Sequence, residues 1–413
     1  MAMREMKDSG IPWIGKIPQN WKTDKINSLY TPRNQKVNDK DYPPLSVTKQ
    51  GVMYQIESVA KTDDHGNRKL VKKGDFAINS RSDRRGSCGI AKYDGSVSLI
   101  NIVLQPQAMM NAKYYDWLFH TTAFADEFYK WGHGIVDDLW TTRWEDMKKI
   151  MIPYPSLSTQ QKIAAYLDSK CAKIDSVKKK VEAEVEALEQ YKRSVITETV
   201  TKGLDKNVEM KDNGIPWIGK TPKDWNLTRI KYTCKSRSEK AFFNHEKDKY
   251  LGLENVIGFS NRIIETDTTY TDGYYDIYRN GDVLFNKLRP YLGKVIIANQ
   301  DGFCTGEFIR LFDYRGDNRF LRYWMINEQF INEVNNSTYG AKMPRANPEF
   351  IMNMLIPVIP YKQQHYVANY LDSKCLKIDS VIQEKQDLLT KLDTYKKSLI
   401  YEYVTGKKEV PAV

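Results

Sequence analysis

Four short stretches of the sequence combine basic side chains with glycine, serine or aromatic residues, a composition suited to binding nucleic acid. The first, NSRSDRRGSCGIAK, places three arginines and a lysine within twelve residues. Arginine can donate two hydrogen bonds to guanine O6 and N7, and it binds backbone phosphate equally well. The candidate contacts in this stretch and in LWTTRW further on are Arg81, Arg84, Arg85, Lys92, Trp140, Thr141 and Arg143.

The other two stretches occupy corresponding places later in the chain. The first stretch of each pair follows a run that begins with Gly-Asp, GDFAIN from residue 74 and GDVLFN from residue 281. For any single residue the alternative is an ordinary solvated charge, but basic loops at two equivalent pairs of places favour contact with DNA. NKLRPYLGK and TYGAKMPRAN contribute the candidates Asn286, Lys287, Arg289, Lys294, Tyr339, Lys342, Arg345 and Asn347.

Catalytic and metal-binding patterns are not found. The sequence contains no G-x-G-x-x-G, no G-x-x-x-x-G-K-[ST] and no H-E-x-x-H. The nearest approach to an N-P-P-Y motif is DYPPL at 41 to 45, which lacks the asparagine and the following aromatic residue. The five histidines do not fall at ligand spacing, and the five cysteines form no C-x-x-C pair, so we expect reduced thiols, no metal and no catalytic residues.

Two strings recur at one fixed offset, which indicates an internal duplication. GIPWIGKIPQNW begins at residue 10, and GIPWIGKTPKDW begins 204 residues later. LDSKCAKIDSV at 167 and LDSKCLKIDSV at 371 keep the same offset and differ at one position. Repeats of this kind determine the architecture. The apolar, turn-rich GIPWIGK strings suit packing better than base recognition.

Each repeat ends in a segment with a heptad pattern, which predicts a long helix. Ser158 or Thr159 can cap the first helix, and Gly203 follows its last turn. We expect the two helices to pack on each other antiparallel; the alternative is that each lies on its own globular domain. The predicted seam is Leu167, Ile174, Val181, Leu188, Val195, Leu371, Ile378, Lys385, Leu392 and Leu399, with Ile163, Cys171, Val177, Val185 and Tyr191 at the intervening positions of the first helix.

The regions between these strings are predicted to be mixed α and β. β-branched runs preceded by turn residues, such as KKGDFAINS and KVIIANQ, predict strands. The fold class is therefore α+β, with two mixed α/β domains linked by two long antiparallel helices and pseudo-two-fold symmetry. The predicted segments are 1–156 (conserved segment and first domain), 157–205 (central helix), 206–359 (linker and second domain) and 360–413 (C-terminal helix and tail).

The charge balance supports a polyanionic partner. The 413 residues carry a formal net charge of +11, which steers a protein toward nucleic acid. No run of eighteen apolar residues is present, and the start, MAMREMKDSG, is charged without an apolar core. We therefore expect a cytoplasmic protein with no membrane partner.

The order of GIPWIGKIPQNW, a variable region, the I-P-x-P turn at 152 to 155 and QQKIAAYLDSKCAKID, all repeated, resembles the specificity subunit of type I restriction-modification enzymes. The resemblance spans nearly the whole chain. It implies two target-recognition domains that each read one half of a split duplex DNA sequence, and a coiled coil that separates them. Lys385 is a charged residue in an otherwise apolar seam. It can contact a methyltransferase subunit, fix the register between the two helices, or extend its ammonium group to the edge of the seam.

The resemblance also implies partners and cofactors. Such a subunit has no active site and docks two methyltransferase (M) subunits, which bind S-adenosylmethionine and methylate adenine. The assembly recruits motor and nuclease (R) subunits that use ATP and Mg. Two alternatives remain open from the residues alone: a non-catalytic coiled-coil scaffold, and a single-stranded nucleic-acid or RNA binder that uses the 26 tyrosines and 9 tryptophans for stacking.

Overall fold

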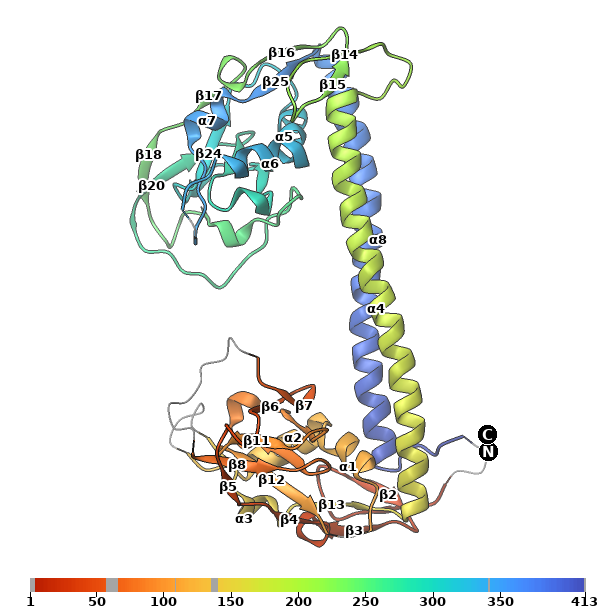
Figure 1. Ribbon diagram of the computed structural model, residues 1–413. Coiled ribbons are helices and arrows are strands. Elements are labelled where there is room, and N and C mark those ends of the chain that lie inside the picture. Colours follow the sequence, from red (N-terminus) through yellow and green to blue (C-terminus); the bar gives the residue numbers. More distant parts are fainter. Residues whose placement is uncertain (1–3, 57–65, 108, 135–139, 341, 412–413) are drawn as a thin grey trace. The chain divides into compact units, whose positions relative to one another are not determined.

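The chain forms two compact units, each of which combines one globular domain with parts of both long helices. The computed structural model describes residues 4–56, 66–107, 109–134, 140–340 and 342–411. The first unit contains residues 1–181 and 387–413, and the second contains residues 182–386. The helices are α4 (Leu157–Lys202) and α8 (Tyr361–Val404) (Figure 1). The predicted class, mixed α/β domains with two long helices, is confirmed.

The domain of the first unit is built from small antiparallel sheets. A four-stranded sheet has the order β10-β9-β12-β4, and a three-stranded sheet has the order β11-β8-β5. Three strand pairs, β1-β2, β3-β13 and β6-β7, complete the strands described here. The bounds are β1 Met6–Asp8, β2 Lys16–Pro18, β3 Lys22–Lys25, η1 Ile26–Ser28, β4 Tyr30–Pro32, β5 Lys36–Val37, β6 Leu45–Thr48, β7 Gly51–Tyr54, β8 Arg68–Val71, β9 Phe76–Asn79, η2 Ser82–Arg84, β10 Cys88–Ile90, β11 Gly95–Ser98, β12 Asn101–Pro106, α1 Ala112–Phe119, α2 Thr122–Lys130, α3 Trp144–Met147 and β13 Met151–Tyr154.

The domain of the second unit repeats this plan with a different second sheet. One four-stranded sheet has the order β17-β24-β21-β22, and another has the order β18-β20-β23-β19, in which β19 and β23 are parallel. The pairs β14-β15 and β16-β25 match β1-β2 and β3-β13 of the first unit. The bounds are β14 Met210–Asp212, β15 Lys220–Pro222, β16 Asn226–Arg229, η4 Ile230–Tyr232, β17 Lys235–Ser236, β18 Lys240–Phe243, β19 Tyr250–Leu251, η5 Leu253–Asn255, β20 Gly273–Tyr278, β21 Val283–Asn286, η6 Pro290–Leu292, β22 Val295–Ile297, β23 Gly302–Cys304, β24 Phe308–Phe312, α5 Asn318–Ile326, α6 Glu328–Asn336, α7 Pro348–Asn353 and β25 Leu355–Val358.

The repeated Gly-Asp dipeptide has the same structural role in both domains. Asp75 and Asp282 precede β9 and β21, and their side chains are only 4% exposed. Each carboxylate accepts two hydrogen bonds from one guanidinium, from Arg33 at 2.6 and 3.1 Å and from Arg237 at 2.9 and 3.2 Å. Two hydrogen bonds offset the cost of burying each charge. The motif therefore fixes the strand that leads into each basic loop.

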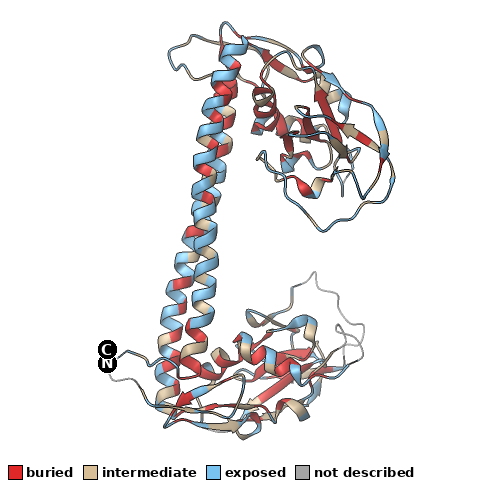
Figure 2. Cartoon of the chain, turned by 180° about the vertical axis from the view of Figure 1, so that it is seen from behind, coloured by how far each residue is buried: buried red, intermediate tan, exposed pale blue. Residues whose placement is uncertain are grey.

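The helices α4 and α8 pack antiparallel within each unit. In the first unit, Lys396 pairs with Asp175 at 2.6 Å and Lys178 pairs with Asp393 at 2.5 Å, so residue numbers rise on one helix as they fall on the other. In the second unit, Lys192 pairs with Asp379 at 2.6 Å. Figure 2 shows the buried residues as a narrow stripe on helices that are otherwise exposed.

All ten predicted seam residues are at least partly buried. Lys385 is half-buried and pairs with Glu184 on α4 at 2.5 Å, which fits a register device. Six of the ten are fully buried: Leu167, Ile174, Val181, Leu371, Ile378 and Leu399; the other four, Leu188, Val195, Lys385 and Leu392, are half-buried.

The prediction of the intervening positions was partly wrong. Val177 and Tyr191 are 45% and 48% exposed. The next residues on the helix, Lys178 and Lys192, turn toward the partner helix instead, and Lys192 is buried. A lysine fits there because its methylene stem packs in the seam while its ammonium group reaches a carboxylate.

The start of α4 also differs from the prediction. Ser156 caps the helix, because its Oγ accepts a hydrogen bond from Thr159 N at 3.3 Å. Ser158 and Thr159 lie inside the helix. Gly203 ends α4 as predicted, with a φ of +75° that favours glycine after a last helical turn.

The ion pair between Lys192 and Asp379 provides a test of the helix packing. In the Asp379→Asn variant Lys192 loses its charged partner while it remains buried, so we expect a loss of about 1–2 kcal/mol of stability. Such a loss lowers the midpoint of thermal unfolding by a few degrees. The double variant Lys192→Met, Asp379→Asn removes the buried charge as well and should recover most of this loss. A double variant less stable than Asp379→Asn alone would contradict the assigned role of the pair.

The first GIPWIGK string lies against the C-terminal end of α8 within the first unit. Tyr401 Oη donates hydrogen bonds to the carbonyl oxygens of Trp13 and Ile14, at 3.0 and 3.2 Å. In the second unit, Gly203 after α4 lies against the ring of Trp225, which follows the second string. In each unit the string region therefore packs near the C-terminal end of a long helix.

Candidate nucleic-acid interface

The two predicted basic loops of the first unit are joined by backbone hydrogen bonds. Ser82 N donates to Trp140 O at 3.0 Å, and Thr142 N donates to Ser80 O at 3.0 Å. Thr141 also exchanges two hydrogen bonds with His133. The segment at 80–82 therefore lies beside the segment at 140–142, which is about sixty residues further along the chain, and the side chains of Arg81–Arg85 and Trp140–Arg143 belong to one surface.

A side-chain turn positions the arginines. Asn79, the last residue of β9, accepts a hydrogen bond from Arg81 N at 3.1 Å and turns the chain into η2. The side chains of Arg84 and Arg85 are 67% and 53% exposed, and that of Arg81 is 38% exposed. All three can therefore reach a ligand in solvent.

Neighbouring carboxylates hold these arginines loosely. Asp83 lies 3.1 Å from Arg81 and 3.5 Å from Arg84, and Asp126 lies 2.8 Å from Arg85. Exposed ion pairs of this kind contribute little stability. A DNA phosphate or guanine edge can replace them, so the pairs preorganise the arginines at little cost to binding.

A groove of about 790 Å³ adjoins this loop and adds residues that the sequence did not single out. The β6-β7 hairpin also lines the groove and contributes Lys49 in the turn and Gln55 just after β7. Amide and ammonium groups of this kind bind base edges and phosphates. No motif marks the hairpin, and only its position beside Arg81 indicates a role.

Two predicted residues of the first unit are placed differently from the arginines. Lys92 follows β10. Its neighbour Ala91 pairs with Asp75 at the open end of the β9-β10 hairpin, whereas Arg81 lies at the end where the hairpin turns. At about 3.3 Å per residue, Lys92 lies on the order of 13 Å from the start of β10. Trp140 is half-buried, and its Nε1 donates to Tyr129 O at 2.7 Å, so it packs beneath the loop. Arg143 is exposed at the edge of the same surface.

The second unit repeats the same backbone arrangement with other side chains. Arg289 N donates to Pro344 O at 2.7 Å and Ala346 N donates to Lys287 O at 3.0 Å, which correspond to the two bonds of the first unit. Tyr339 forms a backbone bridge with Arg345, as His133 does with Thr141 in the first unit. The predicted pairing of loops at equivalent places therefore holds in the backbone.

The exposed residues of this second surface differ in chemistry from the arginines of the first. Arg289 and Lys342 are exposed, and the described part of the chain places no carboxylate within ion-pair distance of either. Tyr339 is 62% exposed, and Tyr291 in η6 is 48% exposed. Tyr291, which the sequence reading did not select, occupies the place of Arg84.

Several predicted residues of the second unit have structural roles. Asn286 is 1% exposed, and both ends of its amide bond the backbone of Leu288, so the prediction that it contacts DNA was wrong. Lys294 Nζ donates to Leu253 O at 2.7 Å, and burial lowers its pKa. Asn347 caps α7 by accepting from Glu349 N at 2.8 Å. These side chains shape the loops.

The two remaining predicted residues, Arg345 and Lys287, are neither free in solvent nor committed to a purely structural role. Arg345 binds both carboxylate oxygens of Glu307, at 2.5 and 3.0 Å, and these hydrogen bonds raise its pKa. Lys287 is half-buried, and burial lowers its pKa. Contact with DNA stays a prediction for both, since each would first exchange an internal interaction.

The sequence of this chain is similar to those of known DNA specificity subunits. A model of the family described as "Type I restriction modification DNA specificity domain" matches residues 18–187. The specificity subunit of the type I restriction enzyme EcoDI from Escherichia coli is 22% identical over 421 residues, covering 95% of this chain and 90% of that protein. The chain is therefore similar to the specificity subunits of type I restriction enzymes. The match of the family model includes the loops that form the first surface.

Solved structures share the fold of this chain. A chain from work on the complex assembly and conformational transition of the type I R-M system aligns with a TM-score of 0.70 at 13% identity, over 95% of this chain and 99% of that one. The HsdS subunit from Thermoanaerobacter tengcongensis aligns with a TM-score of 0.51 at 14% identity, over 95% and 98%. In the part of the chain that is described here, no helix is long and apolar enough to cross a membrane.

Proposed function

We propose that this chain is the DNA specificity subunit of a type I restriction-modification complex, in which each globular domain reads one half of a bipartite duplex target. One observation carries the proposal. Both domains present a loop on the same backbone frame, yet the exposed side chains are Arg81, Arg84 and Arg85 in one and Arg289 and Tyr291 in the other. A constant frame with different side chains is suited to reading two different sequences.

The long helices are proposed to space the domains and to dock two methyltransferase subunits. Apolar residues remain exposed outside the seam at heptad spacing: Val177, Leu388 and Tyr395 in the first unit, and Tyr191 and Val381 in the second. Exposed apolar stripes of this kind mark interaction surfaces. We expect S-adenosylmethionine, ATP and Mg to bind in the methyltransferase, motor and nuclease subunits, and the assembled cytoplasmic complex to methylate adenine and cleave DNA, while this chain supplies no catalytic group.

Mapping methylated adenines tests the proposal. Co-expression of this chain with its methyltransferase subunit should produce methylation within one split sequence, and omission of the chain should abolish it. Filter binding with duplex and single-stranded competitors separates the alternatives, because a scaffold shows no sequence preference and a single-strand binder prefers the unpaired competitor. Specific sites typically bind at least about a thousand-fold more tightly than non-specific DNA. Methylation unchanged by omission of the chain would refute the proposal.

A further inference from the structure

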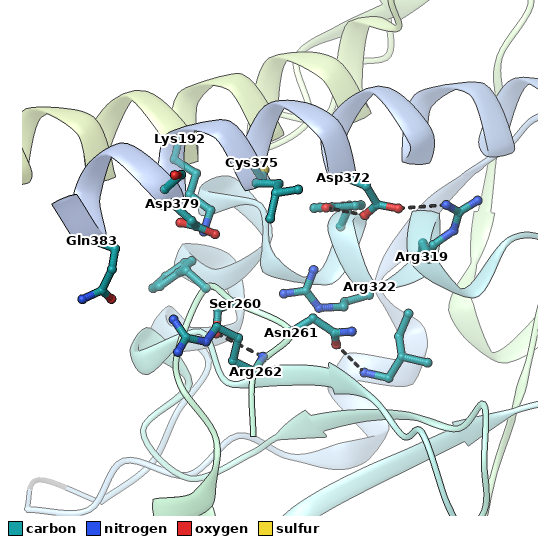
Figure 3. A pocket seen from close by; sticks show the side chains of 15 residues that line it. Lys192, Ser260, Asn261, Arg262, Arg319, Arg322, Asp372, Cys375, Asp379 and Gln383 are labelled. Atoms are coloured by element: carbon teal, nitrogen blue, oxygen red, sulfur yellow. Dashed lines mark hydrogen bonds and ion pairs between the residues drawn. The ribbon is translucent and has the colours of Figure 1, made fainter. Parts of the chain in front are cut away.

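A cavity of about 830 Å³ lies in the second unit and contains none of the residues predicted to contact DNA. Its walls come from α5, α8, Lys192 of α4 and the segment 259–262 (Figure 3). Phe259, Ile297 and Leu376 supply apolar surface, and arginines supply charge. The volume falls in the range of cavities that hold small-molecule ligands.

Arg322 of α5 places a positive charge at this cavity. The residue is 4% exposed, and its Nε donates to Val295 O at 3.0 Å. Burial lowers the pKa of its guanidinium, although an arginine stays charged in proteins. Figure 3 shows the side chain between α8 and the segment that carries Ser260, Asn261 and Arg262.

The acidic residues of the cavity are paired with other groups. Asp372 accepts hydrogen bonds from Tyr323 Oη at 2.7 Å and from Arg319 Nη1 at 2.8 Å. Asp379 accepts two from Lys192, at 2.6 and 2.8 Å. Within the described residues no carboxylate lies within ion-pair distance of Arg322 or of Arg262, whereas the other two cations on the wall, Lys192 and Arg319, are paired with carboxylates. The charge of Asp372 acts on Arg322 from beyond ion-pair distance, and Asp372 is already bonded to Tyr323 and Arg319. A buried charge without a close counter-ion is costly, so its presence points to an anion that is supplied from outside the chain.

The first unit shows that the duplicated fold does not require this arginine. Trp117 donates to Asp168 at 2.9 Å, as Tyr323 donates to Asp372, so these pairs are equivalent. The residue before Trp117 is Asp116, which carries the opposite charge to the arginine before Tyr323. The arginine therefore belongs to the second repeat and is an aspartate in the first, so packing of the shared frame does not explain it.

We propose that this cavity binds a small molecule through a phosphate group held between Arg322 and Arg262. A guanidinium group binds an oxyanion through two parallel hydrogen bonds, and phosphate offers enough oxygens for two such groups. The apolar wall at Phe259, Ile297 and Leu376 accommodates the uncharged part of the ligand. The cavity lies beside both long helices, so an occupied site would brace the second domain against them.

Inorganic phosphate provides the probe. Thermal unfolding of the full chain is measured against increasing phosphate, with sodium chloride at matched ionic strength as the reference. A ligand that binds only the folded state raises the midpoint in a saturable way. We expect this rise in the parent chain, and an apparent affinity at least about tenfold weaker in Arg322→Gln and in Arg262→Gln, because each loses a charge-assisted contact.

The variants are compared by the shift that phosphate produces in each, so a change in intrinsic stability does not obscure the result. Arg262 is exposed, and its replacement leaves the core intact. Arg229→Gln, an exposed arginine of the same unit outside the cavity, is the matched control and should respond like the parent. No saturable effect beyond that of chloride, or an equal effect in all variants, overturns the proposal. Loss of assembly with a methyltransferase subunit in Arg322→Gln without any phosphate response would assign the arginine to a partner's carboxylate and would also overturn it.

Discussion

Replacing Arg81, Arg84 and Arg85 together with alanine is expected to abolish recognition of one half of the DNA target while the other half is still read. Each lost base contact weakens specific binding by about 1–3 kcal/mol. Each lost phosphate contact reduces the slope of log affinity against log salt concentration by about one. The loop lies in the first unit, on a frame separate from that of Arg289, so only one half-site should lose its sequence preference. Binding of the complex with its methyltransferase partner, measured at several salt concentrations, and mapping of methylated adenines provide the readouts.

The matched control removes the same charge from another part of the first unit. Lys16, Lys22 and Lys25 are exposed on β2 and β3, outside the surface formed by the two loops. Their triple alanine variant should lower the general attraction to DNA slightly and retain the methylated sequence. Equal losses in the two triple variants would show that net charge alone matters, and a wild-type methylation pattern in the arginine variant would exclude this loop from DNA recognition.

The long helices could be predicted from the sequence because their pattern follows from simple geometry. A heptad repeat places residues such as Leu167 and Ile174 on one face, and the structure buries both. The search for apolar residues failed at Lys178 and Lys192, because a lysine can occupy a seam when a carboxylate on the other helix receives its charge. That carboxylate can be identified only once the register between the helices is known.

The structure places the basic loops at equivalent positions of the two domains, as the sequence predicts, but composition does not show which of their side chains are exposed. Asn286 and Lys294 point into the domain, whereas Arg289 between them is exposed. Side-chain direction in a loop depends on turn geometry, which local sequence specifies weakly. One signal was available: GDFAIN and GDVLFN both end in asparagine, and Asn79 and Asn286 form the same turn. A residue shared by two otherwise divergent loops indicates structure rather than recognition.

Both ends of the described chain lie in the first unit, which predicts that the chain can be circularly permuted. Glu5 O accepts from Gln19 N in the first GIPWIGK region, and Tyr401 at the end of α8 bonds that same region at Trp13. Val410 also packs against the core of this unit. A chain that begins at Asp205, continues to Val413 and passes through a short flexible linker into Met6 therefore keeps every helix and strand. Termini that are close together at a surface tolerate such rearrangement.

The permuted chain should fold, assemble with the same methyltransferase subunit and direct methylation to the same sequence. The new opening falls just after Gly203, where α4 has ended, so no helical hydrogen bond is lost. A second permutant opened between Lys180 and Val181 provides the control, because it cuts α4 inside the seam and leaves two helical segments whose packing must be regained without chain continuity. We expect this control to be insoluble or inactive. Modified adenines are mapped for both permutants and for the parent. If the chain opened at Asp205 is inactive while the parent is active, the contacts between Tyr401 and the first GIPWIGK string do not suffice to hold the ends of the chain together. The equivalence of the two helix ends would then have to be abandoned.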